Sequence, residues 1–125
     1  MKPLQKYKPL IAKIIPWEQI ENYYDNLISH GFELESMLSL VKFIRTNGFD
    51  KKLFGYIVQL EKLAITIYDP GEYYKETLYI EFNKSTQKWH FEYFPKPHEP
   101  SEAERYYDED QGINKFCQFI EWLKW

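Results

Sequence analysis

Cysteine is nearly absent from this sequence: of its 125 residues, only Cys117 is a cysteine. A single cysteine cannot form a disulfide within the chain, so packing and hydrogen bonds must hold the fold together. Nothing in the cysteine content calls for an oxidising compartment. We therefore expect a cytoplasmic protein.

Long apolar stretches are also lacking. A membrane-spanning helix needs about 20 consecutive apolar residues, and the apolar run near the N-terminus, LIAKII, is interrupted by Lys13. No small-residue cleavage site follows that run, so the pattern does not fit a signal peptide. We therefore predict a soluble chain without a membrane partner.

Glycine and proline are scarce, with five and seven residues, whereas aromatic side chains make up 19% of the chain. This composition excludes a disordered chain, because it supplies enough apolar surface for a core. The length fits one ordinary domain, which hides roughly two thirds of its unfolded surface. Because no repeat or low-complexity linker divides the sequence, we predict a single domain over residues 1–125.

Neither charge sign dominates, since the net charge is only −3, but the charges are unevenly distributed. Residues 1–15 form a basic N-terminal arm without an acid, and residues 95–111 hold six acids against two bases. A nucleic-acid binder needs an extended basic surface to neutralise phosphates. The basic arm is too short for that, so we expect no nucleic-acid partner.

The first half of the chain has the apolar spacing of two helices. In PWEQIENYYDNLISHG, Pro16 suits a first helical turn and Gly31 suits the left-handed residue that ends a helix. A second helix is predicted from about Glu33 to Thr46. Both segments repeat apolar residues three and four positions apart, which marks one buried face. Together they predict an N-terminal helical hairpin.

After Asp50 the apolar period changes from 3.6 to 2, and β-branched and aromatic residues accumulate, which favours strands. Four strands are predicted, at residues 53–59, 63–68, 77–83 and 88–94. A final helix is predicted from Ile113 to Lys124. The sequence thus predicts an α+β fold: an N-terminal helical hairpin, a four-stranded antiparallel meander sheet, and a C-terminal helix packed with the other helices on one sheet face.

Between the last strand and the last helix, residues 95–111 contain too many prolines for a strand. We therefore expect a long acidic loop there. Ser101 and Glu104 have the spacing of a capping box, which could start one or two helical turns.

The hairpin at residues 77–94 has a register that can be derived from the sequence. Across the KSTQ turn, the numbers of opposed residues sum to 171. This register gathers six apolar side chains on one face: Leu78, Ile80, Phe82, Trp89, Phe91 and Tyr93. The other face then carries Thr77, Tyr79, Glu81, His90, Glu92 and Phe94, with His90 directly opposite Glu81.

The pairing of His90 with Glu81 has two interpretations. The first is an ordinary cross-strand pair on a solvated face, worth a few tenths to 1 kcal/mol. The second is an acid/base or metal cluster of Glu81, His90 and Glu92. Zinc sites generally need three or four ligands, and the other histidines, His30 and His98, lie elsewhere in the sequence. We favour the first interpretation and predict no catalytic residue, metal ligand or cofactor.

The absence of catalytic sequence motifs agrees with that choice. The sequence has no GxGxxG, P-loop, HExxH, CxxC or nucleophile elbow. Cys117 falls on the apolar stripe of the last predicted helix, together with Phe116 and Ile120. We therefore interpret it as a small core residue rather than a nucleophile.

Three features could meet a partner. The first is the tyrosine-rich open face of the sheet, because tyrosine combines an apolar ring with a polar tip. It carries Thr66, Tyr68, Thr77, Tyr79, Glu81, His90 and Glu92, together with Tyr56. The second is the acidic loop, where ERYYDED places Tyr106, Tyr107 and Asp108 among charges that suit a basic partner. The third is the last helix, where Trp122 and Trp125 are either covered by residues 95–111, which we favour, or form a homodimer contact.

Two classes of function remain. The first is a small, soluble, non-catalytic binding protein that holds a protein or peptide with a basic surface through the tyrosine-rich face and the acidic loop. Many bacterial toxin-neutralising immunity proteins share this size and composition, although no motif connects them to this chain. The alternative is a small-ligand-binding or hydrolytic domain with Glu81, His90 and Glu92 at a pocket mouth.

Overall fold

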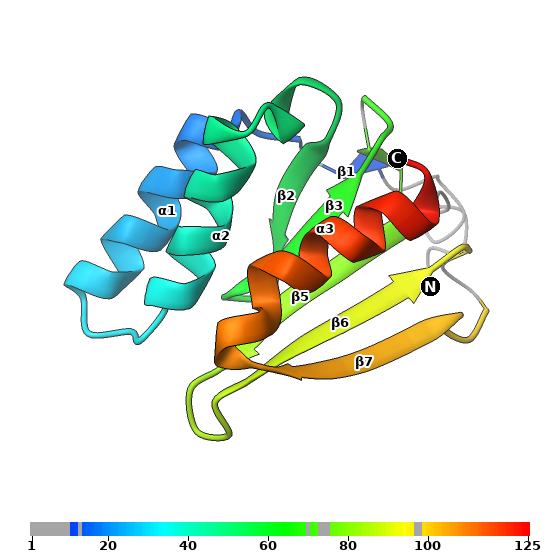
Figure 1. Ribbon diagram of the computed structural model, residues 1–125. Coiled ribbons are helices and arrows are strands. Elements are labelled where there is room, and N and C mark those ends of the chain that lie inside the picture. Colours follow the sequence, from blue (N-terminus) through cyan, green and yellow to red (C-terminus); the bar gives the residue numbers. More distant parts are fainter. Residues whose placement is uncertain (1–10, 13, 70, 73–75, 97–98) are drawn as a thin grey trace, which may run out of the picture.

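The computed structural model describes residues 11–12, 14–69, 71–72, 76–96 and 99–125. The lysines of the predicted basic arm and His98 lie outside these residues. In the described part, a five-stranded antiparallel sheet lies beside a two-stranded one, and the helices pack against the larger sheet (Figure 1). The elements are β1 (Ile11–Ala12), α1 (Trp17–Ser29), α2 (Glu35–Thr46), β2 (Phe54–Val58), β3 (Lys62–Thr66), β4 (Gly71–Glu72), β5 (Thr77–Asn83), β6 (Lys88–Phe94), β7 (Ala103–Asp108) and α3 (Gly112–Leu123).

The predicted helical hairpin is confirmed by α1 and α2. Pro16 immediately precedes α1, and Gly31 after its end has a φ of +97°, the left-handed conformation that the pattern required. Each helix buries one stripe, formed by Trp17, Ile20 and Tyr24 in α1 and by Met37, Leu40, Val41 and Ile44 in α2. The two stripes face the sheet, and the charged faces point outward.

The larger sheet has the strand order β2-β3-β5-β6-β7, with all neighbours antiparallel. The register predicted for the hairpin is confirmed from Thr77 opposite Phe94 to Asn83 opposite Lys88. The predicted inner side chains are buried, and the His90 position lies directly opposite Glu81. The hydrophobic pattern alone therefore fixed the pairing of the two longest strands.

The predicted strand count was wrong, because β7 lies within the segment that we expected to be a loop. The prolines of this segment, at positions 95, 97 and 100, all precede Ala103, so they leave AERYYD free to pair with β6. Pairing runs from Ala103 opposite Tyr93 to Asp108 opposite Lys88. The predicted capping box at Ser101 was also wrong: Asp108 and Gln111 form one, at a short 3₁₀ helix before α3.

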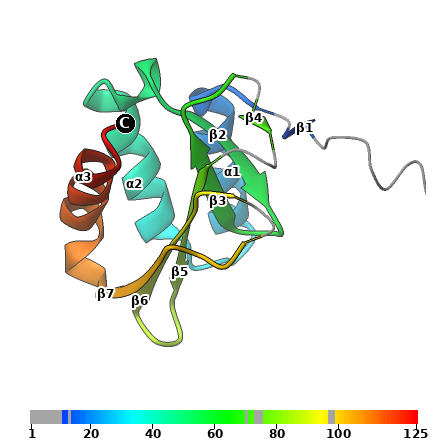
Figure 2. The same ribbon diagram turned by 90° about the vertical axis from the view of Figure 1, so that its right-hand side faces the viewer.

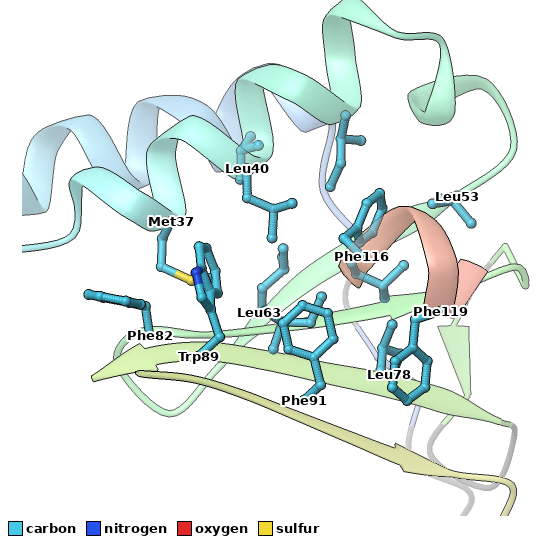
Figure 3. Packing of buried hydrophobic residues seen from close by; sticks show 14 of the residues in the cluster. Met37, Leu40, Leu53, Leu63, Leu78, Phe82, Trp89, Phe91, Phe116 and Phe119 are labelled. Atoms are coloured by element: carbon cyan, nitrogen blue, oxygen red, sulfur yellow. The ribbon is translucent and has the colours of Figure 1, made fainter. Parts of the chain in front are cut away.

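The core lies between the sheet and the three α-helices. Figure 3 shows side chains of α2, α3 and the strands meeting there, with Phe116 of α3 above Phe91 of the sheet and Phe119 beside Leu78. These residues belong to one continuous cluster of buried side chains, which includes the inner faces of all three helices. The predicted placement of the helices on one sheet face is therefore confirmed (Figure 2).

The other face of the sheet is only partly covered. In Figure 2, β1 and β4 lie on the side of the sheet opposite to α2 and α3. Near this end, Tyr56 and Ala64 form a small buried cluster with Ile14, Val58 and Tyr79. Three residues that we expected on the open face are buried instead: Tyr56, Thr66 and Thr77, with exposed fractions of 3%, 1% and 3%. The most exposed side chains of this face belong to β5, β6 and β7. None of the described helices could cross a membrane, because none is both long and apolar enough.

Candidate functional site

Strands β5, β6 and β7 bring together six side chains that we call the acidic face: Tyr79, Glu81, His90, Glu92, Glu104 and Tyr106. Their positions follow from the register. One cross-strand row contains Tyr79, Glu92 and Glu104, and the next contains Glu81, His90 and Tyr106. Successive residues of a strand point to opposite faces, so all six side chains lie on the side away from the helices.

His90 lies at the centre of this face, and its side chain is 17% exposed. Its Nδ1 is 3.3 Å from Glu81 Oε1, and its Nε2 is 2.8 Å from Glu104 Oε2. An ionised carboxylate only accepts hydrogen bonds, so both contacts form together only when both ring nitrogens carry protons. The imidazole ring is thus held between two carboxylates that come from two different strands.

Tyr106 covers one side of the imidazole. The two rings are stacked, with centroids 4.7 Å apart and planes inclined by 20°. The tyrosine is 64% exposed, and the negative charge of Glu104 raises the pKa of its hydroxyl. Next to this stack, Lys88 forms an ion pair with Asp108. A large aromatic ring beside carboxylates is therefore presented to the surroundings.

Glu92 and Glu104 lie directly opposite each other on β6 and β7. Two like charges in such a pair destabilise a sheet. Within the part of the chain that the structure describes, Glu92 forms no ion pair, and Glu104 forms one only with His90, which offsets this cost only when the imidazole is protonated. A local arrangement that opposes the stability of the fold is an indication of function.

The same cluster could hold a cation. His90, Glu92 and Glu104 each offer one ligand atom, and these atoms lie within 4.8 Å of one another. One imidazole nitrogen and two carboxylate oxygens suit zinc or manganese. Glu81 would then accept a hydrogen bond from the other ring nitrogen, as carboxylates commonly do beside metal-bound histidines. The cluster of Glu81, His90 and Glu92, which the sequence offered as the alternative interpretation, therefore gains Glu104 as a candidate ligand, with Glu81 behind the histidine.

The chain matches no family model, no curated protein and no solved structure. Its function must therefore be inferred from the chemistry of its surfaces.

The remaining predicted partner residues are divided between different surfaces. Tyr68 follows β3, and its hydroxyl donates a hydrogen bond to Glu76 Oε1 over 3.0 Å. Asp108 lies on the same side of the sheet as the acidic face, at the end of β7. Tyr107 points the other way, toward the helices, where its ring contacts Phe91 with centroids 5.3 Å apart. The two adjacent tyrosines of ERYYDED therefore belong to different surfaces.

Trp122 also lies on the helix side of the sheet. Our expectation that residues 95–111 cover it was wrong, because its exposed fraction is 54%. Its indole packs edge-on against Phe119 and Tyr93, with centroids 5.5 and 6.0 Å away. Trp125 is half-buried against the core, so only one of the two rings is openly exposed.

Cys117 is half-buried and packs against the main core, as the apolar stripe predicted. Burial raises the pKa of its thiol, which disfavours the thiolate that a nucleophile requires.

Sequence reasoning missed Glu104, because it assigned this residue to a helical cap in a loop. A signal was present in AERYYD, where polar and less polar residues alternate. The alternation is weak, since Arg105 takes a position on the inner face. The segment therefore contains too few alternating apolar residues to predict a strand so close to several prolines.

Proposed function

We propose that this protein is a non-catalytic binding module whose acidic face holds a basic segment of a partner protein. The observation that carries the proposal is the meeting of Glu81, Glu92 and Glu104 on three neighbouring strands around one imidazole. A lysine or arginine of the partner would relieve the repulsion between Glu92 and Glu104. The energy that this pair costs the free protein would be recovered in the complex.

The two tyrosines at the edges of this face suit the same partner. A cation that approaches the carboxylates also meets the ring of Tyr106, and aromatic faces attract ammonium and guanidinium groups. Tyr79 already has this kind of contact within the chain, because the Nζ atom of Lys62 lies 5.8 Å from its ring centroid. Tyrosine also supplies a large contact area with few rotatable bonds, which limits the entropy lost on binding.

A narrower form of the proposal is that the partner is a basic toxin, which this protein neutralises as an immunity protein would. Its support is the small size, the acidic charge and the aromatic content of the chain. A toxin or secretion gene beside the gene for this chain would support this form. Neighbouring genes without such a function would count against it, while the broader proposal of a basic partner would stand.

The proposal is tested by capture from a cell lysate with the immobilised protein and with a Tyr106→Ala/Glu92→Gln variant, because Tyr106 is largely exposed. We expect the wild-type protein to retain a partner that the variant loses, while both have similar melting temperatures. The matched control is Glu121→Gln, which removes an exposed acid from α3, on the other side of the sheet. Capture that survives in the double variant would show that the acidic face is not the binding surface.

A second function, metal-dependent binding or hydrolysis, is favoured by the converging ligand atoms of His90, Glu92 and Glu104. Calorimetric titration with Zn²⁺ would test it. The metal proposal predicts saturable heat that disappears in His90→Asn and in Glu104→Gln. If the wild-type protein gives no such heat, or if both variants keep it, the metal proposal is wrong and the binding-module proposal is unaffected.

A further inference from the structure

A second surface lies on the other side of β7. Because side chains alternate along a strand, Arg105 and Tyr107 point away from the acidic face and toward α3. Together with α3 these two side chains line an open cleft of about 240 Å³. Its walls include Arg105, Tyr107, Lys115, Gln118, Phe119 and Trp122. In Figure 1 the chain passes from β7 almost directly into α3, so the two elements that form the cleft are adjacent in sequence.

The cleft contains two cations that the described residues do not neutralise. Neither Arg105 nor Lys115 forms an ion pair with any acid in the described ranges, although the chain has 19 acids. The guanidinium donates a hydrogen bond over 2.9 Å to the backbone oxygen of Glu104. The lysine ammonium lies 3.4 Å from Gln118 Oε1 and 5.4 Å from the centre of the Tyr107 ring. Both groups therefore keep donors for an anion.

The wall opposite β7 is aromatic. Phe119 is 6% exposed and forms part of the core, and the openly exposed Trp122 packs edge-on against it. An exposed tryptophan beside a hollow offers a flat apolar face on which a planar ring can lie. The combination of an aromatic wall and two cations is typical of sites that hold an apolar body by contact and orient it through a charged group.

We propose that this cleft binds a small aromatic carboxylate. The ring would lie against Trp122 and Phe119, and the carboxylate would accept hydrogen bonds from Arg105 and Lys115. Arginine presents paired donors that match the two oxygens of a carboxylate. The cleft is smaller than the roughly 300 to 1,000 Å³ of sites for drug-sized molecules, which favours a ligand of one or two rings over a peptide. This site is independent of the proposed partner surface, because it lies on the opposite face of β7.

The test is an NMR titration of the ¹⁵N-labelled protein with 2-naphthoate and, separately, with the neutral 2-naphthamide. We expect naphthoate to shift the amides of β7 and of Lys115 to Trp122, and the indole N–H of Trp122. The amide should bind at least about fivefold more weakly, because it loses the modest charge interactions with Arg105 and Lys115. Shifts confined to other residues, equal binding of both compounds, or no saturation at about 5 mM would overturn the proposal.

Two substitutions with a control identify the groups that hold the carboxylate. Arg105→Gln and Lys115→Gln should each weaken naphthoate binding several-fold and leave naphthamide binding unchanged, whereas Lys88→Gln, on the opposite face, should change neither. Unchanged naphthoate binding in both cleft variants would show that these cations do not hold the carboxylate.

Sedimentation of the free protein tests the other possible occupant of the cleft, a second copy of the chain. A dimer that Trp122→Ala dissociates would overturn the small-molecule proposal, and a monomer supports it.

Discussion

Glu92 and Glu104 show most clearly that the acidic face is not arranged for stability alone. Their carboxylates oppose each other across β6 and β7. We predict that Glu92→Gln raises the free energy of unfolding by about 0.2 to 1 kcal/mol, the range for cross-strand pairs. Urea unfolding of the variant beside the wild-type protein measures this change. A variant that is less stable than the wild-type protein would mean that Glu92 supports the fold.

Gly112 is needed because it has no side chain, and not because its backbone is flexible. Its backbone is helical, so alanine would ordinarily favour the helix, but a Cβ atom there would lie 2.2 Å from the indole of Trp89. The same indole donates a hydrogen bond to the Glu109 backbone oxygen over 2.9 Å, which leaves the ring little room to move. The start of α3 can therefore approach the sheet closely only because this position has no side chain.

We predict that Gly112→Ala lowers the free energy of unfolding by about 1 to 3 kcal/mol, the usual cost of overpacking a core. Chemical denaturation gives the value. In a Trp89→Leu background the smaller side chain relieves the clash, so the same substitution should cost clearly less. An equal cost in both backgrounds would show that the glycine acts through the backbone and not through its contact with Trp89.

At the residue scale, the sequence predicted part of the candidate site. His90 was placed opposite Glu81 because only one register puts the bulky side chains of both strands on a single face. Glu104 and Tyr106 were not placed, although they complete the contacts of the imidazole. Those contacts depend on β7, whose pairing is a long-range feature that no local pattern revealed.

At the scale of elements, the helices and the first four strands of the larger sheet were predictable because each has a strong apolar period. Strand β7 lacks one: its burial is limited to Ala103 and, in part, Tyr107, and its other side chains are exposed. An edge strand with charged side chains is poor in hydrophobic signal, and these charges protect it from pairing with other chains. The exposed charged side chains that made β7 hard to predict from the sequence are thus ones that edge strands require.

Hydrogen exchange tests whether β7 is a strand in solution. In an edge strand only the amides that face its neighbour are protected, so we predict slow exchange at about every second residue from Ala103 to Asp108. The amides of β6, which has neighbours on both sides, should be protected throughout. Uniformly fast exchange across residues 103–108 would show that this segment is a loop, as the prolines suggested. Glu104 would then not be held beside His90.

For the molecule as a whole, buried tyrosines limit stability at high pH. Burial raises the pKa of Tyr24 well above its usual value of 10, and the neighbouring Tyr23 and Glu61 add to the shift. Burial and a hydrogen bond to Glu76 likewise raise the pKa of Tyr93. A raised pKa in the folded state means that the folded protein holds the phenol proton more tightly than the unfolded chain does. The stabilisation is therefore complete below about pH 10 and is lost as the pH rises further.

We predict that the free energy of unfolding falls by about 1.4 kcal/mol per pH unit above pH 10 for each such tyrosine. Tyr24→Phe removes one of these phenol protons, so the free energy of unfolding of the variant should decline less steeply with pH. At pH 7 the variant should be less stable than the wild-type protein, because the hydrogen bond to the Glu61 backbone oxygen is lost. Urea unfolding at several pH values gives both slopes. Identical slopes for the two proteins would contradict the assignment to Tyr24.

The whole molecule presents two chemically different surfaces on the two sides of one edge strand. The acidic face carries Glu104 and Tyr106 of β7, and the cleft against α3 carries Arg105 and Tyr107. The α+β class and the placement of the helices on one face could be predicted from periodicity, but this separation could not. It depends on the register of β7, which turns one acidic segment of the sequence into two surfaces of different charge.

The most direct test of the acidic face is a calorimetric titration with a peptide of alternating arginine and glycine. The protein is compared with Glu92→Gln/Glu104→Gln and with Glu99→Gln/Glu121→Gln, a control that removes the same number of charges elsewhere. We predict that the first variant binds at least about tenfold more weakly than the wild-type protein, as loss of charge-assisted contacts would give, and that the control binds nearly as well. An equal loss in both variants would show attraction to net charge alone and would contradict a defined binding surface on β5, β6 and β7.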